Sequence, residues 1–440
     1  MEVSRDAKLA CMLTTEEVVS RCPCTFACFA LLVLGCESLP EAPRNARLTE
    51  SSIASSPAGL RCQADVQQKQ HTDYGQSGAH QVGVLDITFE DRARPIVANA
   101  KHAAAPARTL PTSIYYPTSG PAPLFGAAPL ASGGPFPLLV YSHGYGSNRA
   151  EATHLGERAA SHGYVLIATD FPFTNTDRLL SGESLDTSDI VNQAGDVSFL
   201  IDQALALSRD RSHVLSNAVD AARIGVTGVS MGGLTTLLVA LHPKLQDARI
   251  RAAAPIAPLS SFFMPEFYHT RELPMLVVSG DLDAFIDYDL NARRTFERAA
   301  PNAQLVTLTQ GTHAAFAFQL DEPTLRLMNA LLAPDAAPTN ADGFGCAVTG
   351  ETLRGDQDYL APLGGKESFI AYDAVKEPWL PCSGDEYKQP GMDTAVQVEI
   401  AAQAVVAFFE AHLGSTSEKR QDGCRYLLHE LPKQPAVRVE

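Results

Sequence analysis

From residue 82 to residue 309, short and strongly apolar runs alternate with longer amphipathic stretches. The apolar runs are rich in Val, Ile and Leu, and they predict strands near residues 82–90, 110–117, 137–142, 164–169, 222–229, 251–257, 274–279 and 304–309. Helical spacing of apolar residues predicts helices near residues 149–162, 188–208 and 232–242. Strands that alternate with helices indicate an α/β fold, with a mostly parallel sheet and helices on both faces.

This core is expected over residues 81–320, and a long segment at 321–392 follows it. The segment is too long for a simple loop, and apart from a helical pattern at 322–332 it is rich in Gly, Asp and Pro. It is an insertion that forms either a lid or cleft wall, or a surface excursion held by a disulfide. Residues 393–414 predict an amphipathic helix that closes the core, and residues 415–440 are expected to form a C-terminal tail.

The N-terminus has the pattern of an export signal. Residues 26–36 are an apolar run, too short to span a membrane, that ends in Leu-Val-Leu-Gly-Cys and resembles a bacterial lipobox. We therefore expect residues 1–35 to be a lipoprotein signal peptide and Cys36 to carry lipid, anchoring an exported protein to the bacterial cell envelope. An ordinary signal peptide or an uncleaved anchor is the alternative. Residues 36–80, rich in Ser, Pro, Ala and Gln, predict a flexible tether.

Charge and cysteine content narrow the possible partners and the compartment. The net charge of −16 argues against nucleic acid as a partner, and nothing in the sequence indicates the oligomeric state. Beyond Cys36, four cysteines remain, and an even set in an exported chain suggests disulfides. Three pairings are possible, and Cys346 with Cys382 is favoured because both lie in the insertion; free buried thiols are the alternative.

A candidate nucleophile stands between the predicted strand 222–229 and the helix that follows. Gly228-Val229-Ser230-Met231-Gly232 fits G-x-S-x-G, which places a serine at a sharp, strained strand-to-helix turn. The strand before the motif and the helix after it are the context that this motif requires. A solvated serine in a tight turn is the alternative interpretation.

An acid and a base follow in the chain order Ser, Asp, His. Asp283 follows the strand at 274–279, and His313 follows the strand at 304–309. Two nearby acids compete with Asp283: Asp281 is suited to cap the turn, and Asp287 to cap the next helix. Four other histidines lie downstream of Ser230, at helix ends, in a polar loop and in the tail: His242, His269, His412 and His429.

Two backbone N–H groups are candidates for an oxyanion hole. One is that of Met231, directly after the serine, and the other is that of Tyr145, in the loop after strand 137–142. His143 precedes the serine and is interpreted as a packed structural imidazole. Apolar residues after the strands either line an acyl pocket or belong to the core: Phe171, Phe173, Phe262, Phe263, Met264, Phe285 and Phe316.

These segments resemble the platelet-activating-factor acetylhydrolase-like group of α/β-hydrolases, whose bacterial members are also described as predicted dienelactone hydrolases. The resemblance rests on "FPLLVYSHGYGSNRAEATHLGERAASHGYVLIATDFPFTN", "GVTGVSMGG", "VVSGDLDAFID" and "GTHAAFAF", and covers roughly residues 80–320 with the last helix. "SMGG" and "ASHGYVLIATD" are also similar to cutinase-like polyester hydrolases. The serine argues against dienelactones, where the nucleophile is cysteine.

The resemblance implies an α/β-hydrolase fold and a serine hydrolase of carboxylic esters, with a small-molecule or lipid ester as substrate, including acetylated or short-chain lipid esters. A cutinase-like polyester hydrolase and a non-catalytic surface-binding lipoprotein are the alternatives. We expect no cofactor and no metal, since the sequence contains no H-E-x-x-H, no paired C-x-x-C and no phosphate-binding glycine loop.

Overall fold

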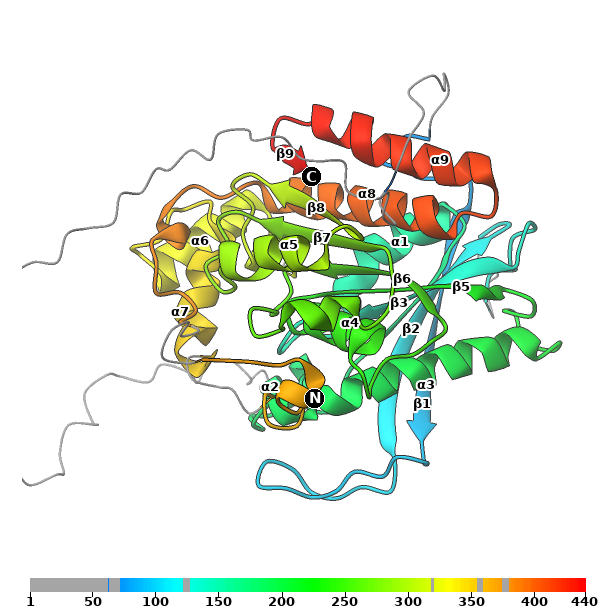
Figure 1. Cartoon of the computed structure of the whole chain (residues 1–440), viewed down its shortest axis with the longest axis horizontal. Coiled ribbons are helices and arrows are strands. Elements are labelled where there is room, and N and C mark those ends of the chain that lie inside the picture. Colours follow the sequence, from blue (N-terminus) through cyan, green and yellow to red (C-terminus); the bar gives the residue numbers. More distant parts are fainter. Residues whose placement is uncertain (1–61, 63–71, 122–126, 318–319, 354–358, 374–379) are drawn as a thin grey trace, which may run out of the picture. The chain divides into compact units, whose positions relative to one another are not determined.

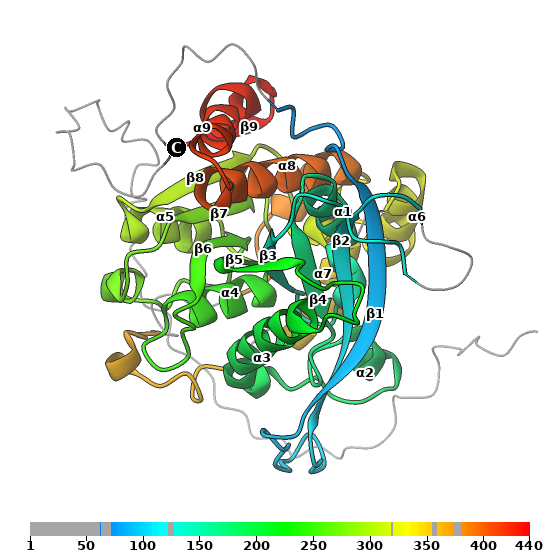
Figure 2. The same cartoon turned by 90° about the vertical axis from the view of Figure 1, so that its right-hand side faces the viewer.

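The computed structural model describes residues 62, 72–121, 127–317, 320–353, 359–373 and 380–440, which all belong to the second of the chain's two units, residues 55–440. The described residues form one nine-stranded sheet in the order β1-β2-β4-β3-β5-β6-β7-β8-β9 (Figures 1 and 2). The strands are β1 (Gln81–Asp91), β2 (Arg108–Thr118), β3 (Phe136–Ser142), β4 (Val165–Thr169), β5 (Val219–Val229), β6 (Ile250–Ile256), β7 (Met275–Gly280), β8 (Ala303–Leu308) and β9 (Val437–Val439).

The six central strands, β4, β3, β5, β6, β7 and β8, run parallel, while β1, β2 and β9 pair antiparallel at the edges. The α/β-hydrolase expectation of a mostly parallel sheet is confirmed. Every residue of β3, β4, β7 and β8 is buried, because helices cover both faces of a parallel sheet.

The helices are α1 (Thr153–Ser161), α2 (Thr176–Leu180), α3 (Ile190–Arg209), α4 (Met231–Leu241), α5 (Arg294–Ala299), α6 (Glu322–Leu332), α7 (Ala341–Leu353), α8 (Thr394–Leu413) and α9 (Ser417–Arg425). The shorter helical turns are η1 (Arg149–Ala152), η2 (Thr187–Asp189), η3 (Pro265–His269), η4 (Asp289–Arg293), η5 (Ala314–Phe316), η6 (Lys366–Ser368), η7 (Glu386–Lys388), η8 (Tyr426–Glu430) and η9 (Leu431–Lys433).

Two hydrophobic clusters lie on the two faces of the sheet. One joins α3 and α4 to side chains such as Leu138 and Val140 of β3, and the other joins α1 and α8 to Leu139 and Tyr141 of the same strand. Successive side chains of a strand point to opposite faces, so β3 contributes to both clusters. α8 is long and apolar enough to cross a bilayer, but 78% of its most apolar window is buried inside the fold, as expected for a core helix.

The sheet order places a switch point beside the center of the sheet. From β3 the chain passes to β4 on one side, and it returns to add β5 on the other side. Ligands of open α/β sheets bind at the carboxyl ends of the strands at such a point. The loop after β3 and the serine after β5 lie at these ends, which directs attention to Ser230 and Tyr145.

Both ends of the described chain are more ordered than the sequence suggested. The tether expected over 36–80 includes packed residues, since Tyr74 is buried and the Thr72 N–H donates to Asp422 at 2.9 Å. The expected tail at 415–440 contains α9, which packs on α8, and β9, which pairs with β8 through Val306 and Val439. Cys36 lies outside the described residues.

Two disulfides join segments that the strand and helix pattern left unassigned. Cys346 of α7 is bonded to Cys382, and Cys62 is bonded to Cys424 of α9. The first bond joins the two cysteines of the insertion, and the second ties the segment before β1 to the helix after α8.

We predict that the two disulfides differ in what they contribute to the free energy of unfolding. In the chain-entropy model, closing 362 residues rather than 36 favors the Cys62–Cys424 bond by about 2 kcal/mol. Urea unfolding of Cys62→Ser/Cys424→Ser should therefore show the larger loss, with Cys346→Ser/Cys382→Ser as the matched control. An equal or smaller loss for the longer bridge would contradict the prediction.

Candidate active site

Ser230 occupies a strained turn between β5 and α4. Its φ of 58° and ψ of −116° lie outside the regions that L residues prefer, and its N–H donates to the Ile256 carbonyl at 2.9 Å. A Cβ on Gly228 or Gly232 would collide with the Ser142 carbonyl oxygen of β3. The two glycines of G-x-S-x-G therefore allow β3, β5 and α4 to meet closely around the serine.

Asp283 and His313 lie in the loops after β7 and β8, and their side chains meet. His313 Nδ1 is 2.7 Å from Asp283 Oδ2. The Asp283 side chain has no exposed surface, and its Oδ1 accepts hydrogen bonds from the N–H groups of Phe285 at 3.0 Å and Ile286 at 2.7 Å. The carboxylate is thus oriented by its own loop, and it fixes the imidazole.

The electrostatic surroundings favor a charged His313. Burial alone would lower the pKa of the imidazole, but the attraction and the hydrogen bond of Asp283, with weaker attraction from Asp342 and Glu151, outweigh it and raise the pKa above its ordinary value. A partly buried imidazole beside carboxylates is suited to accept a proton from a nearby hydroxyl.

The competing acids have other partners: Asp287 caps the helical turn that follows it, whereas Asp281 bonds to distant segments rather than to its own turn. Asp281 Oδ1 accepts from the Gln310 N–H at 2.7 Å, and its Oδ2 pairs with Arg438 at 3.0 Å. Asp287 accepts from the Leu290 N–H at 2.7 Å.

Other histidines have packing partners. His143 is buried; its Nε2 accepts from the Phe171 N–H at 3.0 Å, and its Nδ1 lies 2.7 Å from the Gly144 carbonyl. His242 Nε2 lies 3.0 Å from the Leu363 carbonyl. The His412 ring packs against Phe408, and desolvation lowers its pKa to about 4.

A cavity of about 400 Å³ brings the candidate residues together. Ser230, His313, Tyr145 and Met231 all line it, so the proposed nucleophile, base and two N–H donors share one space. Asp283 lies behind His313. Of the apolar residues singled out in the sequence, Phe285 lines the cavity, and Phe171, Phe262 and Phe263 are buried in the core cluster.

The insertion forms one wall of this cavity. Met328 of α6, three residues of α7 and Tyr359 line it, the three being Phe344, Gly345 and Val348. α2 contributes Thr176 and Leu179 on another side. The described residues of α6 and α7 thus contribute to a wall of this cavity, and the same segment carries the Cys346–Cys382 disulfide.

Two further carboxylates near His313 were not found by sequence reasoning. Glu151 of η1 lines the cavity; its Oε1 accepts from the Tyr141 hydroxyl at 2.7 Å and from the Gly144 N–H at 3.1 Å, and burial raises its pKa. Asp342 of α7 accepts from the His313 N–H at 3.0 Å. Neither stands in a recognizable motif. Among the described residues, no three His, Cys, Asp or Glu side chains are grouped so that they could hold a metal ion.

Comparison with known proteins identifies the family. The model of the PET hydrolase-like family matches residues 108–328, which is just over half of the chain and includes Ser230, Asp283 and His313. The chain belongs to the PET hydrolase-like family. The similarity to cutinase-like polyester hydrolases that the sequence indicated is confirmed.

Curated relatives of this PET hydrolase-like protein include Cutinase est1 of Thermobifida alba, 34% identical over 145 residues, which are 33% of this chain and 42% of the relative. The bis(hydroxyethyl) terephthalate hydrolase of Streptomyces coelicolor is 31% identical over 172 residues, 39% of this chain and 44% of the relative. The chain thus spans less than half the length of these relatives. A solved ferulic acid esterase from Streptomyces cinnamoneus aligns with a TM-score of 0.47 and 18% identity, over 78% of this chain and 95% of that one.

Proposed function

We propose that this protein is a serine hydrolase that cleaves carboxylic esters through an acyl-enzyme. The observation that carries the proposal is the shared cavity, in which Ser230 at its strained turn lies with His313, whose Nδ1 is bonded to the buried Asp283. Membership of the PET hydrolase-like family supports the same chemistry.

In the proposed mechanism, Ser230 attacks the ester carbonyl while His313 accepts the hydroxyl proton. Asp283 fixes the imidazole tautomer and stabilizes the imidazolium that forms. The N–H groups of Tyr145 and Met231 stabilize the negative charge on the carbonyl oxygen. His313 then donates the proton to the departing alcohol, and water releases the acid from Ser230. The mechanism needs no cofactor.

The proposed substrates are small esters with an apolar acyl group, including short-chain or acetylated lipid esters. The volume of about 400 Å³ suits a small molecule, and Leu234, Leu259 and Ile286 give the lining apolar character. A wall built by α7 limits how far an acyl group can extend, and α7 lies beyond the residues that the family model matches.

A cutinase-like polyester hydrolase is the second candidate, and the names of the relatives favor it. Both candidates use the same catalytic machinery, so they differ only in what the cavity and its rim admit. A catalytically silent binding protein is the alternative from another class.

We predict that Ser230→Ala abolishes ester hydrolysis and fluorophosphonate labeling while the fold is kept. Asp283→Asn should lower kcat by about 10⁴-fold, because the imidazole loses its orienting carboxylate. Asp281→Asn is the matched control and should stay within a few-fold of the parent, since that side chain pairs with Arg438. Turnover that survives Ser230→Ala, or equal losses at the two aspartates, would contradict the assignment.

We predict that p-nitrophenyl esters with short acyl chains are cleaved with higher kcat/KM than palmitoyl esters. Phe344→Ala should raise the relative rate on long acyl chains, because Phe344 lines the cavity. Leu331→Ala, at an exposed position of α6, is the control and should leave the ratio unchanged. The screen should include an acetyl phospholipid, bis(hydroxyethyl) terephthalate and a polyester film; hydrolysis of the film as the preferred reaction would favor the second candidate.

Export with a lipid anchor on Cys36 is also part of the proposal. Its support is the lipobox-like sequence that ends at Cys36 and the two disulfides, which persist in oxidizing compartments. We expect Cys36→Ser to abolish incorporation of a fatty-acid analogue when the full chain is expressed in a bacterium that processes lipoproteins. Cys28→Ser is the control, and labeling that persists in Cys36→Ser would refute the anchor.

A further inference from the structure

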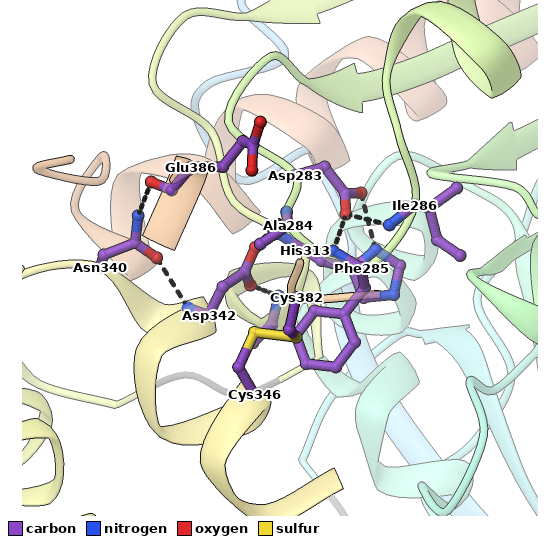
Figure 3. Close-up of a disulfide and its surroundings, with 11 residues drawn as sticks. Asp283, Ala284, Phe285, Ile286, His313, Asn340, Asp342, Cys346, Cys382 and Glu386 are labelled. Carbon is purple, nitrogen blue, oxygen red and sulfur yellow. Dashed lines mark hydrogen bonds and ion pairs between the residues drawn. A yellow bond between two sulfur atoms is a disulfide. The ribbon is translucent and has the colours of Figure 1, made fainter. Parts of the chain in front are cut away.

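A buried aspartate of the insertion holds the two loops that carry the proposed acid and base. Asp342, in the first turn of α7, has no exposed surface. Its Oδ2 accepts from the N–H of Ala284 at 2.9 Å and from that of His313 at 3.0 Å, and its Oδ1 accepts from the Ala314 N–H at 2.6 Å. Figure 3 shows Asp342 directed toward Ala284 and His313. One carboxylate thus bridges the residue after Asp283 and the backbone of His313.

The start of α7 is itself fixed in place. The Asn340 side chain accepts from the Asp342 N–H at 2.9 Å, and its amide donates to the carbonyls of Glu386 at 3.0 Å and Gln389 at 2.9 Å. Asn340 is buried, with no exposed surface. The Asp342 carboxylate is therefore presented by a rigid helix start, where the helix dipole also favors a negative charge.

The disulfide of the insertion also fixes Ala284, through the carbonyl group of that residue. Cys346 lies one helical turn after Asp342 and is bonded to Cys382, whose N–H donates to the Ala284 carbonyl at 2.6 Å. Ala284 is consequently held at its N–H by Asp342 and at its carbonyl by Cys382 (Figure 3). The covalent bond keeps these two contacts at a constant spacing.

A purely structural role accounts poorly for a charge at this position. A buried carboxylate costs free energy unless hydrogen bonds satisfy it. All three backbone N–H groups that donate to Asp342 belong to the loops that carry Asp283 and His313. Asp342 stands outside the cavity lining and beyond the residues matched by the family model. It is thus a feature of this chain's own insertion, placed to act on the base through the backbone and through its charge.

We propose that Asp342 is a positioning residue, which holds the Asp283 and His313 loops in register and adds a second buried negative charge to the field acting on the imidazole. The proposal rests on the proposed function, in which His313 is the base.

Three carboxylates from three elements face His313: Asp283 from the loop after β7, Asp342 from α7 and Glu151 from η1. Burial, followed by repulsion from Asp283, raises the pKa of Asp342 to about 6, although His313 and the backbone donors oppose the shift. Asp342 is therefore charged at neutral pH and supports the imidazolium. A base must be neutral to accept a proton, so removing this charge should lower the pKa of His313 and move the acid limb of the activity profile to lower pH.

The variant Asp342→Asn tests both parts of the role. An amide has one acceptor oxygen, and its NH₂ group must face at least one of the N–H groups of Ala284, His313 and Ala314. We expect kcat on a small p-nitrophenyl ester to fall about 10-fold to 100-fold, with KM changed less than about 2-fold, and the acid limb to shift to lower pH. Asp321→Asn is the matched control, because Asp321 caps α6 in the same insertion with exposed surroundings, and it should behave like the parent.

The pKa of His313 can be measured without any substrate, by NMR titration of ring-labeled histidine assigned through His313→Ala. A lower His313 pKa in Asp342→Asn supports the role of Asp342. If the parent hydrolyses no ester, that result refutes the proposed function but not the effect of Asp342 on His313. An unchanged His313 pKa in Asp342→Asn overturns the proposal. If the parent cleaves esters, the proposal is also overturned when the pKa changes but kcat and the acid limb of Asp342→Asn match those of the parent.

A variant that fails to fold still leaves a decisive measurement on the parent. The pKa of His313 in the parent, measured by the same titration, should then lie above the ordinary value for histidine, because buried carboxylates act on the imidazole. A pKa at or below the ordinary value would overturn the proposal.

Discussion

A carboxylate with no exposed surface is stable only when hydrogen-bond donors surround it, and Asp283 is such a group. Its donors are the N–H groups of Phe285 and Ile286 in its own loop and Nδ1 of His313 from the next loop. The two loops can meet because Gly280 and Gly311 pack backbone against backbone, where a Cβ on Gly280 would collide with Gly311. Pairing of β7 with β8 sets Gly280 opposite Leu308, three residues before Gly311.

The same geometric requirement recurs at the other half of the site. Ser230 reaches the cavity because β3, β5 and α4 approach closely at Gly228 and Gly232. The free energy stored in its positive φ is offset by the packing of α4, all of whose residues are buried. The site is therefore built where parallel strands end, and small residues there let backbones touch.

The periodicity of the sequence was sufficient to predict the parallel strands, because runs such as "MLVVS" and "FPLLVYS" must be buried on both faces. It was insufficient for β9, which has three residues and gains its order from pairing with β8. It was also insufficient for α7, whose sequence "ADGFGCAVTGETL" has glycines at positions where a helix prefers other residues. There tertiary contacts and the Cys346–Cys382 bond override local preference.

Chain order and strand ends were enough to single out Ser230, Asp283, His313, Tyr145 and Met231, and four of these line one cavity with the fifth behind it. Asp342 and Glu151 could not be found in the same way. Each is a lone acid without a motif, and only the fold shows what it contacts. Asp342 accepts from Ala284 and Ala314, which lie 58 and 28 residues away in the sequence, and Glu151 accepts from Gly144 in the loop after β3. The pattern "NAD" at 340–342, typical of a helix start, is the one signal that could have marked Asp342.

The contacts of Asp342 also decide how the insertion can act. A hinged lid must leave the cavity as a body, and α7 could do so only by breaking three hydrogen bonds to a buried charge, each worth about 1.5–3 kcal/mol. The disulfide to Cys382 adds a covalent restraint. α7 is therefore a fixed wall of the cavity. Under the proposed function, this insertion bounds the space for the acyl group and also holds the proposed base. Changes in α7 that enlarge the cavity should then lower kcat as well.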